Sequence, residues 1–503
     1  MIRFASILFM ATIVGATSGL ATPATAQDAP QNASPAPGAK AVLTDYDAFL
    51  SILRTDYAGF EIKTAGDKAA EFERLAADTR AALAEDPRQF DRLMDEMVRW
   101  FEDRHLGLRR VAGTPGPMPS PPTPALDVEA LKLQGRMIGP GEVEAGLTDA
   151  GGLAGEWVTL DKGYTLALIP DPADAGRWVA VVRDTTFSTW APGQVKFTVG
   201  RGEGGRYDVV YQMGDHSERP MQLIPLPGGT MLKLTDGEFV VFLERPEADN
   251  TALKDRLFAP QDFTLTRLSN DTLLLRLPDF APENRTVIEG HLAEHHEALT
   301  STPNLVIDAR YNNGGSDGSY SKLMKYLYTR PIYAIGVEFR ATERNIAAYE
   351  ALIEQYRNEL DAETLAYLDT LVIKARANVG GWIVPQEHGF SIVAHDKVMP
   401  YPKRVGILTE GAGSSGDQFV IDARFSRKVT TFGKPTAGVI DFSNVVSEPL
   451  PSGRFEMSWP MTRSLRLPEE PYDNVGVAPD VPFGEEVADP VGYVQAWLER
   501  QVD

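Results

Sequence analysis

A dense run of prolines divides this chain and restricts how it can fold. Six prolines fall between Pro115 and Pro124, and such a run favours a stiff, extended connection over a helix or a central strand. The chain has 503 residues, more than a single hydrophobic core usually organises. We therefore interpret 111–125 as a proline-rich linker and expect separate modules before and after it.

The segment before the linker, 41–110, has apolar residues at helical spacing. Near its end they recur at i, i+3, i+4, i+7 and i+8, which places them on one buried helical face. These residues are Phe90, Leu93, Met94, Met97 and Val98. We expect 41–110 to form an N-terminal helical module.

The segments after the linker follow two further patterns. Between 126 and 250, short β-type runs are separated by Gly, Pro and Asp, which predicts an antiparallel sandwich or small barrel. From 260 to 503, buried strands alternate with helices, and a charged helical stretch near 343–377 is interpreted as an insertion. The predicted fold class is therefore multidomain α+β, with a helical module, a β-rich middle domain and a C-terminal α/β core.

The first 26 residues have the pattern of a secretory signal peptide. Arg3 precedes an apolar run, 4–20, and Ala24-Thr25-Ala26 supplies the small-x-small pattern at which such segments are cut. An uncleaved anchor is the alternative, but the run is short and interrupted by glycines and hydroxyl residues. We expect 1–26 to be removed and 27–40 to be a flexible spacer. The mature protein is then periplasmic or secreted, with no integral membrane segment.

Charge and cysteine content exclude several function classes. The formal net charge is −21 and the pI is about 4.9, which opposes the attraction to phosphates that drives nucleic-acid binding. There are no cysteines, so disulfides, thiolate nucleophiles and cysteine-based metal sites are excluded. We expect no nucleic-acid partner and no cofactor, and the sequence does not indicate an oligomeric state.

Two glycine-rich turns, each after a predicted buried strand, contain candidate site residues. The first ends in Gly314-Gly315, and the second places Ser414 where a strand gives way to a helix. Glycines let backbone N–H groups approach an oxyanion, and the start of a helix favours negative charge. From these residues alone, Ser414 is either a helix cap or a nucleophile. The second turn does not have the Gly-x-Ser-x-Gly pattern of the α/β-hydrolases, because Ala412 replaces its first glycine around Ser414 and Asp417 replaces its last around Ser415.

Together these turns resemble the C-terminal processing (tail-specific) and tricorn-type serine peptidase family. The run 304–315 (NLVIDARYNNGG) is similar to the family's strand and turn motif, and Ser414 precedes Asp417 at the spacing of the family's nucleophile and acid. The runs 433–438 (GKPTAG) and 476–480 (GVAPD) match two more family motifs. The resemblance implies a crotonase-like peptidase core that acts on polypeptide or peptide substrates.

The resemblance covers roughly 43–110 and 262–482, and it distinguishes between two catalytic designs in the family. One design places a lysine base directly after Pro-Thr-x-Gly, where this chain has Val439. The other, tricorn-like design takes a histidine from the N-terminal module, and Asp103-Arg104-His105 lies at that motif. The resemblance therefore implies Ser414 as nucleophile and His105 as general base.

The family's remaining site residues are carried over in the same way. An acid just before the Gly-Val-Ala-Pro-Asp motif orients the base directly or through a neighbouring hydroxyl, and here that acid is Asp473, where the family usually has Glu. Backbone N–H groups of Gly314, Gly315 and Ser415 are the implied oxyanion donors. The function implied is an exported serine endopeptidase or carboxy-terminal processing peptidase that forms an acyl-enzyme on Ser414.

Several alternatives stay open at this point. Ser415 can replace Ser414 as nucleophile, Lys434 or Lys428 can supply the base, and His105 can be structural, with the fold serving a non-catalytic ligand-binding or peptide-binding protein. A metal site from His291 and His295 is the remaining alternative. The residue after His291 is Leu292, so the glutamate of a His-Glu-x-x-His metalloprotease motif is missing, and we expect no catalytic metal.

Overall fold

The computed structural model describes residues 39–112, 127–148, 152–202, 207–357, 362–484 and 487–501. The expected signal peptide 1–26, nearly all of the spacer and nearly all of the proline-rich linker lie outside these residues. Among the described residues, no helix is both long and apolar enough to cross a membrane.

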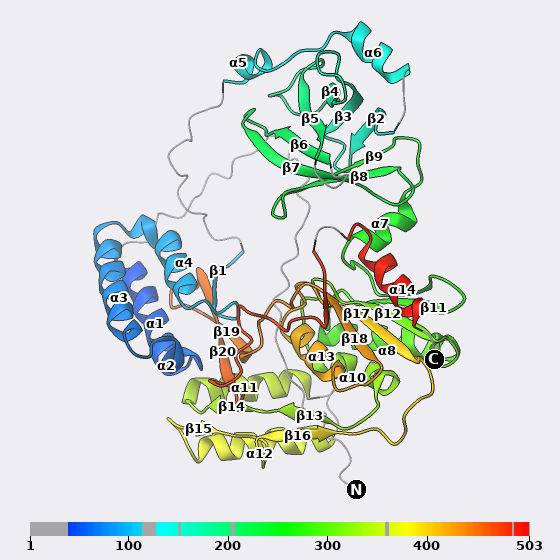
Figure 1. Ribbon diagram of the computed structural model, residues 1–503. Coiled ribbons are helices and arrows are strands. Elements are labelled where there is room, and N and C mark those ends of the chain that lie inside the picture. The colour runs from blue at the N-terminus through cyan, green and yellow to red at the C-terminus, as the bar shows by residue number, and fades with distance from the viewer. Residues whose placement is uncertain are drawn as a thin grey trace. The chain divides into compact units, whose positions relative to one another are not determined.

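The chain divides into two compact units (Figure 1). The core unit comprises Met1–Met118, Ala259–Pro482 and Val494–Asp503. The barrel unit comprises Pro119–Phe258 and Phe483–Tyr493. The helical module thus belongs to the same compact unit as most of the α/β segment, and a short stretch near the C-terminus belongs to the barrel unit.

The first sheet of the core unit has six strands in the order β10-β11-β12-β17-β18-β21. All neighbours are parallel except the antiparallel pair β10 and β11. The strands are β10 (Thr264–Arg267), β11 (Thr272–Arg276), β12 (Asn304–Asp308), β17 (Arg404–Leu408), β18 (Val429–Gly433) and β21 (Val481–Pro482). Every residue of β12 is buried, as expected for a parallel strand covered on both faces.

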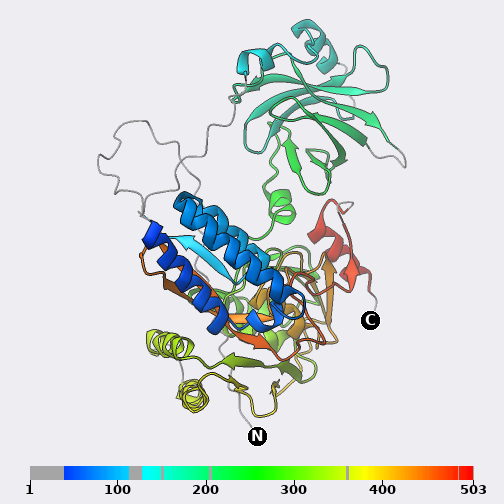
Figure 2. The same cartoon turned by 90° about the vertical axis from the view of Figure 1, so that its left-hand side faces the viewer.

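The second sheet joins the N-terminal helices to the rest of the core unit. Strand β1 (Gly107–Arg110), directly after the helices, pairs with β20 (Phe455–Ser464). The other strands are β14 (Val337–Arg340), β15 (Trp382–Ile383) and β19 (Phe442–Pro449), and a separate two-stranded sheet contains β13 (Ile332–Ile335) and β16 (Phe390–Val393). Figure 2 shows the N-terminal helices beside β1.

The N-terminal helices and the stretch expected as an insertion share one hydrophobic core. That core contains Phe49 of α1, Met94 of α4, Ile346 of α11 and Leu371 of α12, together with Trp459 of β20. The helices are α1 (Ala39–Thr55), α2 (Phe60–Lys63), α3 (Lys68–Glu85), η1 (Pro87–Gln89), α4 (Phe90–Trp100), α11 (Glu343–Tyr356) and α12 (Ala362–Arg376). The charged stretch expected as an insertion therefore packs its apolar face into the core of the helical module.

The remaining helices of the core unit flank the first sheet or follow it. They are η3 (Pro282–Asn284), α8 (Arg285–Glu294), α9 (His296–Leu299), α10 (Asp317–Leu327), α13 (Ser415–Ala423) and α14 (Pro490–Arg500), the last of which begins in residues of the barrel unit. Helix α10 begins at an N-cap, since the Ser316 side chain accepts a hydrogen bond from the Gly318 N–H.

The β-rich domain is a closed barrel of eight antiparallel strands, which decides between the sandwich and the barrel predicted for it. Its strands are β2 (Gly155–Thr159), β3 (Tyr164–Pro170), β4 (Trp178–Thr185), β5 (Val195–Arg201), β6 (Tyr207–Gln212), β7 (Glu218–Pro225), β8 (Met231–Thr235) and β9 (Val240–Glu244). Helices α5 (Val128–Lys132), α6 (Pro140–Thr148) and α7 (Thr251–Leu257) belong to the same unit. Trp157 and Trp190 are buried in the barrel core.

Candidate active site

Ser414 lies at a strained turn between a strand and a helix. Strand β17 ends at Leu408, helix α13 begins at Ser415, and Ser414 caps that helix with φ 58° and ψ −119°. A serine at positive φ costs roughly 1–3 kcal/mol and persists only where the surroundings hold it. A strained strand-to-helix turn presents the nucleophile in the α/β-hydrolases. Ser414 forms a capping box with Asp417, and its positive φ adds a strain that a helix cap does not require.

Asp417 holds this turn through three backbone N–H groups. Its Oδ2 accepts hydrogen bonds from Ser414 N at 2.8 Å and Val439 N at 3.0 Å, and its Oδ1 accepts one from Gly438 N at 3.0 Å. Burial raises the pKa of Asp417, and the hydrogen bonds from Thr436, Val439, Gly438 and Ser414 oppose that rise. Asp417 thus ties the Ser414 turn to the segment 438–442, which we call the bridging segment.

The first glycine-rich turn lies directly against Ser414. Gly413 N donates to Asn312 O at 2.8 Å. A Cβ added at Gly314 would lie 2.5 Å from Gly413 O and 2.7 Å from Ser414 Cβ, and Gly314 has φ +76°. Only glycine fits this close backbone approach.

The three expected oxyanion donors differ in availability. The Gly314 N–H already donates to Asn312 Oδ1 at 2.9 Å, so it is engaged. Within the described part of the chain, the Gly315 N–H has no acceptor. Ser415 is the first residue of α13, where an N–H group has no acceptor within its helix. Gly315 and Ser415 are therefore better placed as donors than Gly314.

His105 lies in the loop between α4 and β1, and it contacts the bridging segment. Its backbone N–H donates to Asp103 Oδ1 at 2.9 Å, and its Nδ1 lies 2.6 Å from Phe442 O, at the end of the bridging segment. A carbonyl oxygen only accepts hydrogen bonds, so Nδ1 carries the proton and Nε2 of the neutral ring has a free lone pair. This is the tautomer that a general base at Nε2 requires.

Asp473 also binds the bridging segment. Its Oδ1 accepts hydrogen bonds from Ile440 N at 2.9 Å and Asp441 N at 2.8 Å. Burial, and then the charge of Asp103, raise the pKa of Asp473 to about 7. Among the described residues there is no hydrogen bond from His105 to Asp473 or to Ser414. The backbone carbonyl of Phe442, which sequence analysis did not single out, is the group that orients the imidazole.

A small cavity lies beside the two serines. Ser414, Ser415 and Gln418 line it from the helix side, and Asp317 and Arg466 line it from other elements. Burial, together with the charge of Asp422, raises the pKa of Asp317 to about 8. Sequence analysis missed Asp317 and Arg466, although Asp317 follows the Gly314-Gly315 turn at an interval of two residues.

The lysines considered as alternative bases have other partners. Lys434 pairs with Glu410 at 3.0 Å, and the Lys428 ammonium donates to Met399 O at 2.6 Å. Val439, at the expected lysine position, donates its N–H to Asp417. These contacts do not join either lysine to Ser414.

A possible metal-binding group lies elsewhere, on α8 and its C-terminal end. Single ligand atoms of His291, Glu294 and His295 lie within 4.8 Å of one another. None of the three lines the cavity at Ser414.

Comparisons with known proteins agree with the resemblance drawn from the sequence. Residues 271–483 match the model of peptidase family S41. This segment includes Ser414, Asp473 and both glycine-rich turns, whereas His105 lies outside it.

A comparison with curated proteins finds no match, and a comparison with solved structures finds several peptidases. The crystal structure of mature CPAF is 14% identical with a TM-score of 0.48, and the alignment covers 92% of this chain and 96% of that one. The photosystem II D1 C-terminal processing protease is 12% identical with a TM-score of 0.34, covering 89% and 94%. The tricorn protease is 14% identical with a TM-score of 0.38, covering 92% and 37%. Residues 271–483 of the chain are thus similar to peptidase family S41, and this match supports a hydrolase.

Proposed function

We propose that the chain is a serine peptidase that hydrolyses peptide bonds in exported proteins or peptides, with Ser414 as nucleophile and His105 as general base. One observation carries the proposal. The bridging segment 438–442 is held at one end by Asp417 of the Ser414 turn and bonded at the other end by His105. Two residues far apart in the sequence are thus positioned through one short stretch of backbone. The expected signal peptide supports the exported substrate.

The chemistry follows from the free lone pair on His105. In the acylation step, Ser414 Oγ attacks the scissile carbonyl carbon while its proton passes to His105 Nε2. The N–H groups of Gly315 and Ser415 stabilise the oxyanion. His105 then gives its proton to the leaving amine as the C–N bond breaks. In the deacylation step, water attacks the acyl carbon while His105 takes its proton, and His105 returns that proton to Ser414 Oγ as the ester bond breaks. The acylation step requires His105 Nε2 to come within hydrogen-bond reach of Ser414 Oγ when substrate binds.

Asp473 has a positioning role in this scheme. Its carboxyl group binds the N–H groups of Ile440 and Asp441, so it fixes the backbone whose next carbonyl orients His105. The acid therefore acts on the base through the bridging segment. We propose this route through the backbone in place of the one that the family resemblance implied, in which the acid orients the base directly or through a neighbouring hydroxyl.

Labelling with a fluorophosphonate probe tests the nucleophile. The wild-type chain should be labelled, Ser414→Ala should lose the label, and Ser415→Ala should keep it, because only Ser414 lies at the strained turn. Equal labelling of wild type and Ser414→Ala contradicts the assignment. Absence of labelling in all three chains favours the non-catalytic binding protein.

Hydrolysis of a fluorogenic peptide tests the base. His105→Ala should lower kcat/KM by about 10²–10⁴-fold, since general-base assistance is lost, and Lys434→Ala should keep the wild-type value because Lys434 is paired with Glu410. The reverse pattern restores a lysine base and rejects His105.

A further inference from the structure

A groove beside the Ser414 cavity contains a buried arginine that the catalytic scheme does not use. Arg466 is only 8% exposed, and its Nε has no hydrogen-bond partner among the described residues. Arg466 and Ile335 line both the groove and the cavity that contains Ser414. The two hollows therefore adjoin, and a peptide bound at Ser414 can extend past Arg466 into the groove.

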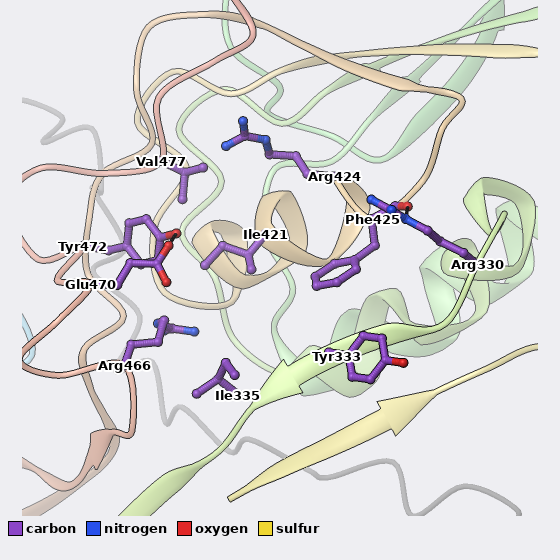
Figure 3. Close-up of a pocket in the computed structure, with 10 residues that line it drawn as sticks. All are labelled: Arg330, Tyr333, Ile335, Ile421, Arg424, Phe425, Arg466, Glu470, Tyr472 and Val477. Atoms are coloured by element: carbon purple, nitrogen blue, oxygen red, sulfur yellow. Dashed lines mark hydrogen bonds between the residues drawn. The ribbon is translucent and has the colours of Figure 1, made fainter.

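The groove combines an apolar lining with positive charge. Figure 3 shows Ile421 on α13 and Phe425, just after the end of α13, across from Tyr333 and Ile335 on β13, with Arg466 near Ile335. Such a lining suits an apolar stretch of peptide, because aromatic and aliphatic side chains gain from excluding water.

The charged residues of the groove are three arginines and one glutamate, in a chain whose net charge is −21. Arg424 is paired with Asp480 at 3.0 Å, Arg330 Nε donates to Phe425 O at 2.6 Å, and Glu470 accepts a hydrogen bond from Tyr472. Arg466 differs from the other two arginines because it is buried and forms no ion pair with a described residue.

Two carboxyl groups influence Arg466 without forming an ion pair with it. Asp317 and Asp422 both interact electrostatically with Arg466, and Asp422 is already bonded to Tyr320 and Gln418. A buried guanidinium with an unused donor is costly unless an acceptor reaches it. A carboxylate is the acceptor that its planar fork fits best.

We infer that this groove is a substrate subsite that binds a carboxylate of the peptide, with Arg466 as the residue that recognises it. The inference rests on the proposed peptidase function and gives that function a substrate class: peptides with an apolar segment and an anionic group near the scissile bond. The carboxylate can come from an acidic side chain or from the C-terminus, and the chemistry of recognition is the same.

Binding to the non-hydrolysing chain tests the subsite separately from catalysis. Four fluorescein-labelled peptides share one apolar sequence and combine Glu or Gln at one position with a free or an amidated C-terminus. Fluorescence anisotropy on the Ser414→Ala chain gives Kd for each. Kd should be about 10–100-fold lower for the peptide with the recognised carboxylate than for its neutral match, as a charged hydrogen bond predicts. The Glu and Gln pair reports a side-chain carboxylate, and the free and amidated pair reports the terminal one.

Substitution of the arginine assigns the effect to its side chain. When Arg466→Gln is added to the Ser414→Ala chain, the difference in Kd between charged and neutral peptides should disappear. Arg466→Lys should retain part of that difference. Arg376→Gln removes an exposed charge on α12 that is paired with Glu350, and it should change nothing. Equal Kd values for all four peptides on the Ser414→Ala chain overturn the inference even if Arg466→Gln does not fold. The inference is also overturned if the difference in Kd between charged and neutral peptides persists in Arg466→Gln, or if it is lost in Arg376→Gln. If the Ser414→Ala chain discriminates between charged and neutral peptides but the wild-type chain hydrolyses no peptide, the subsite is supported and the peptidase function is rejected.

Discussion

Asp317 makes the site sensitive to pH at the scale of single residues. Its carboxyl group lies in the cavity with Ser414 and Ser415, its Oδ1 is enclosed without a hydrogen-bond partner among the described residues, and its pKa is about 8. Asp422, whose pKa burial raises to about 6, adds to this effect through its charge. The folded protein therefore favours the neutral form of Asp317.

The stability of the core unit should change with pH accordingly. The pKa of Asp317 rises from 3.8 to about 8 on folding, so its contribution to stability is present below pH 3.8 and is lost as pH rises towards 8. Asparagine mimics the neutral acid. The difference in Tm between Asp317→Asn and wild type should therefore grow in favour of the variant between pH 4 and 8, as measured by thermal unfolding.

A surface substitution provides the control for this pH dependence. Asp47 is exposed and paired with Arg80. The difference in Tm between Asp47→Asn and wild type should therefore change little between pH 4 and 8. A flat difference for Asp317→Asn as well would show that its carboxyl group titrates normally in the folded protein.

At the scale of elements, the connection between the Ser414 turn and the bridging segment depends on one carboxylate. Asp417 is fully buried, and both of its oxygens accept backbone hydrogen bonds. In Asp417→Asn the amide NH₂ group must face at least one of these N–H donors. We expect a loss of about 1–3 kcal/mol in the free energy of unfolding.

The same substitution should lower kcat, because the turn that presents Ser414 and the backbone that leads to His105 both lose their anchor. Denaturant unfolding and peptide hydrolysis measure the two effects. The exposed Asp47→Asn variant should leave both at wild-type values. Normal kcat in a folded Asp417→Asn chain would mean that Asp417 does not position the site.

At the scale of the whole core unit, Trp459 on β20 connects the second sheet to the helices that pack against it. Its side chain is fully buried on β20, and its Nε1 donates to Asn345 Oδ1 of α11 at 2.9 Å. Asn345 in turn donates to Asp56 O at 2.8 Å, after the end of α1. Strand β20 also pairs with β1, two residues beyond His105. The position of His105 thus depends on this docking.

Trp459→Ala should therefore affect stability and activity together. Removal of a buried tryptophan costs about 3–5 kcal/mol, and kcat/KM should fall at denaturant concentrations where most of the chain is still folded. Circular dichroism and peptide hydrolysis, followed along the same urea series, measure this. Ile373→Ala, at a site on α12 that is 68% exposed, is the control. Activity that falls only with global unfolding would show that His105 does not depend on the docking.

Local patterns in the sequence predicted much of the core unit. The buried run of β12, the glycines after it and the strand, turn and helix at Ser414 are determined by neighbours in the chain, so pattern and family resemblance both located them. The helical stretch 343–377 was also found, but as an insertion, because periodicity shows an apolar face without showing what covers it. The barrel was predicted only as one of two β architectures, since closure depends on the pairing of β2 with β9, strands about 80 residues apart.

The sequence by itself determined where the turns, their glycines and their candidate nucleophile lie, because these follow from backbone conformation over a few residues. Only the tertiary structure decided what each candidate contacts. His105 forms a hydrogen bond with a backbone carbonyl 337 positions away. Asp473 binds the bridging segment and not the base. The Gly314 N–H donates to the Asn312 side chain. Such contacts depend on how distant segments pack together. Every residue carries a backbone carbonyl and nearly every residue an N–H group, so no sequence pattern indicates which of them will form a given contact.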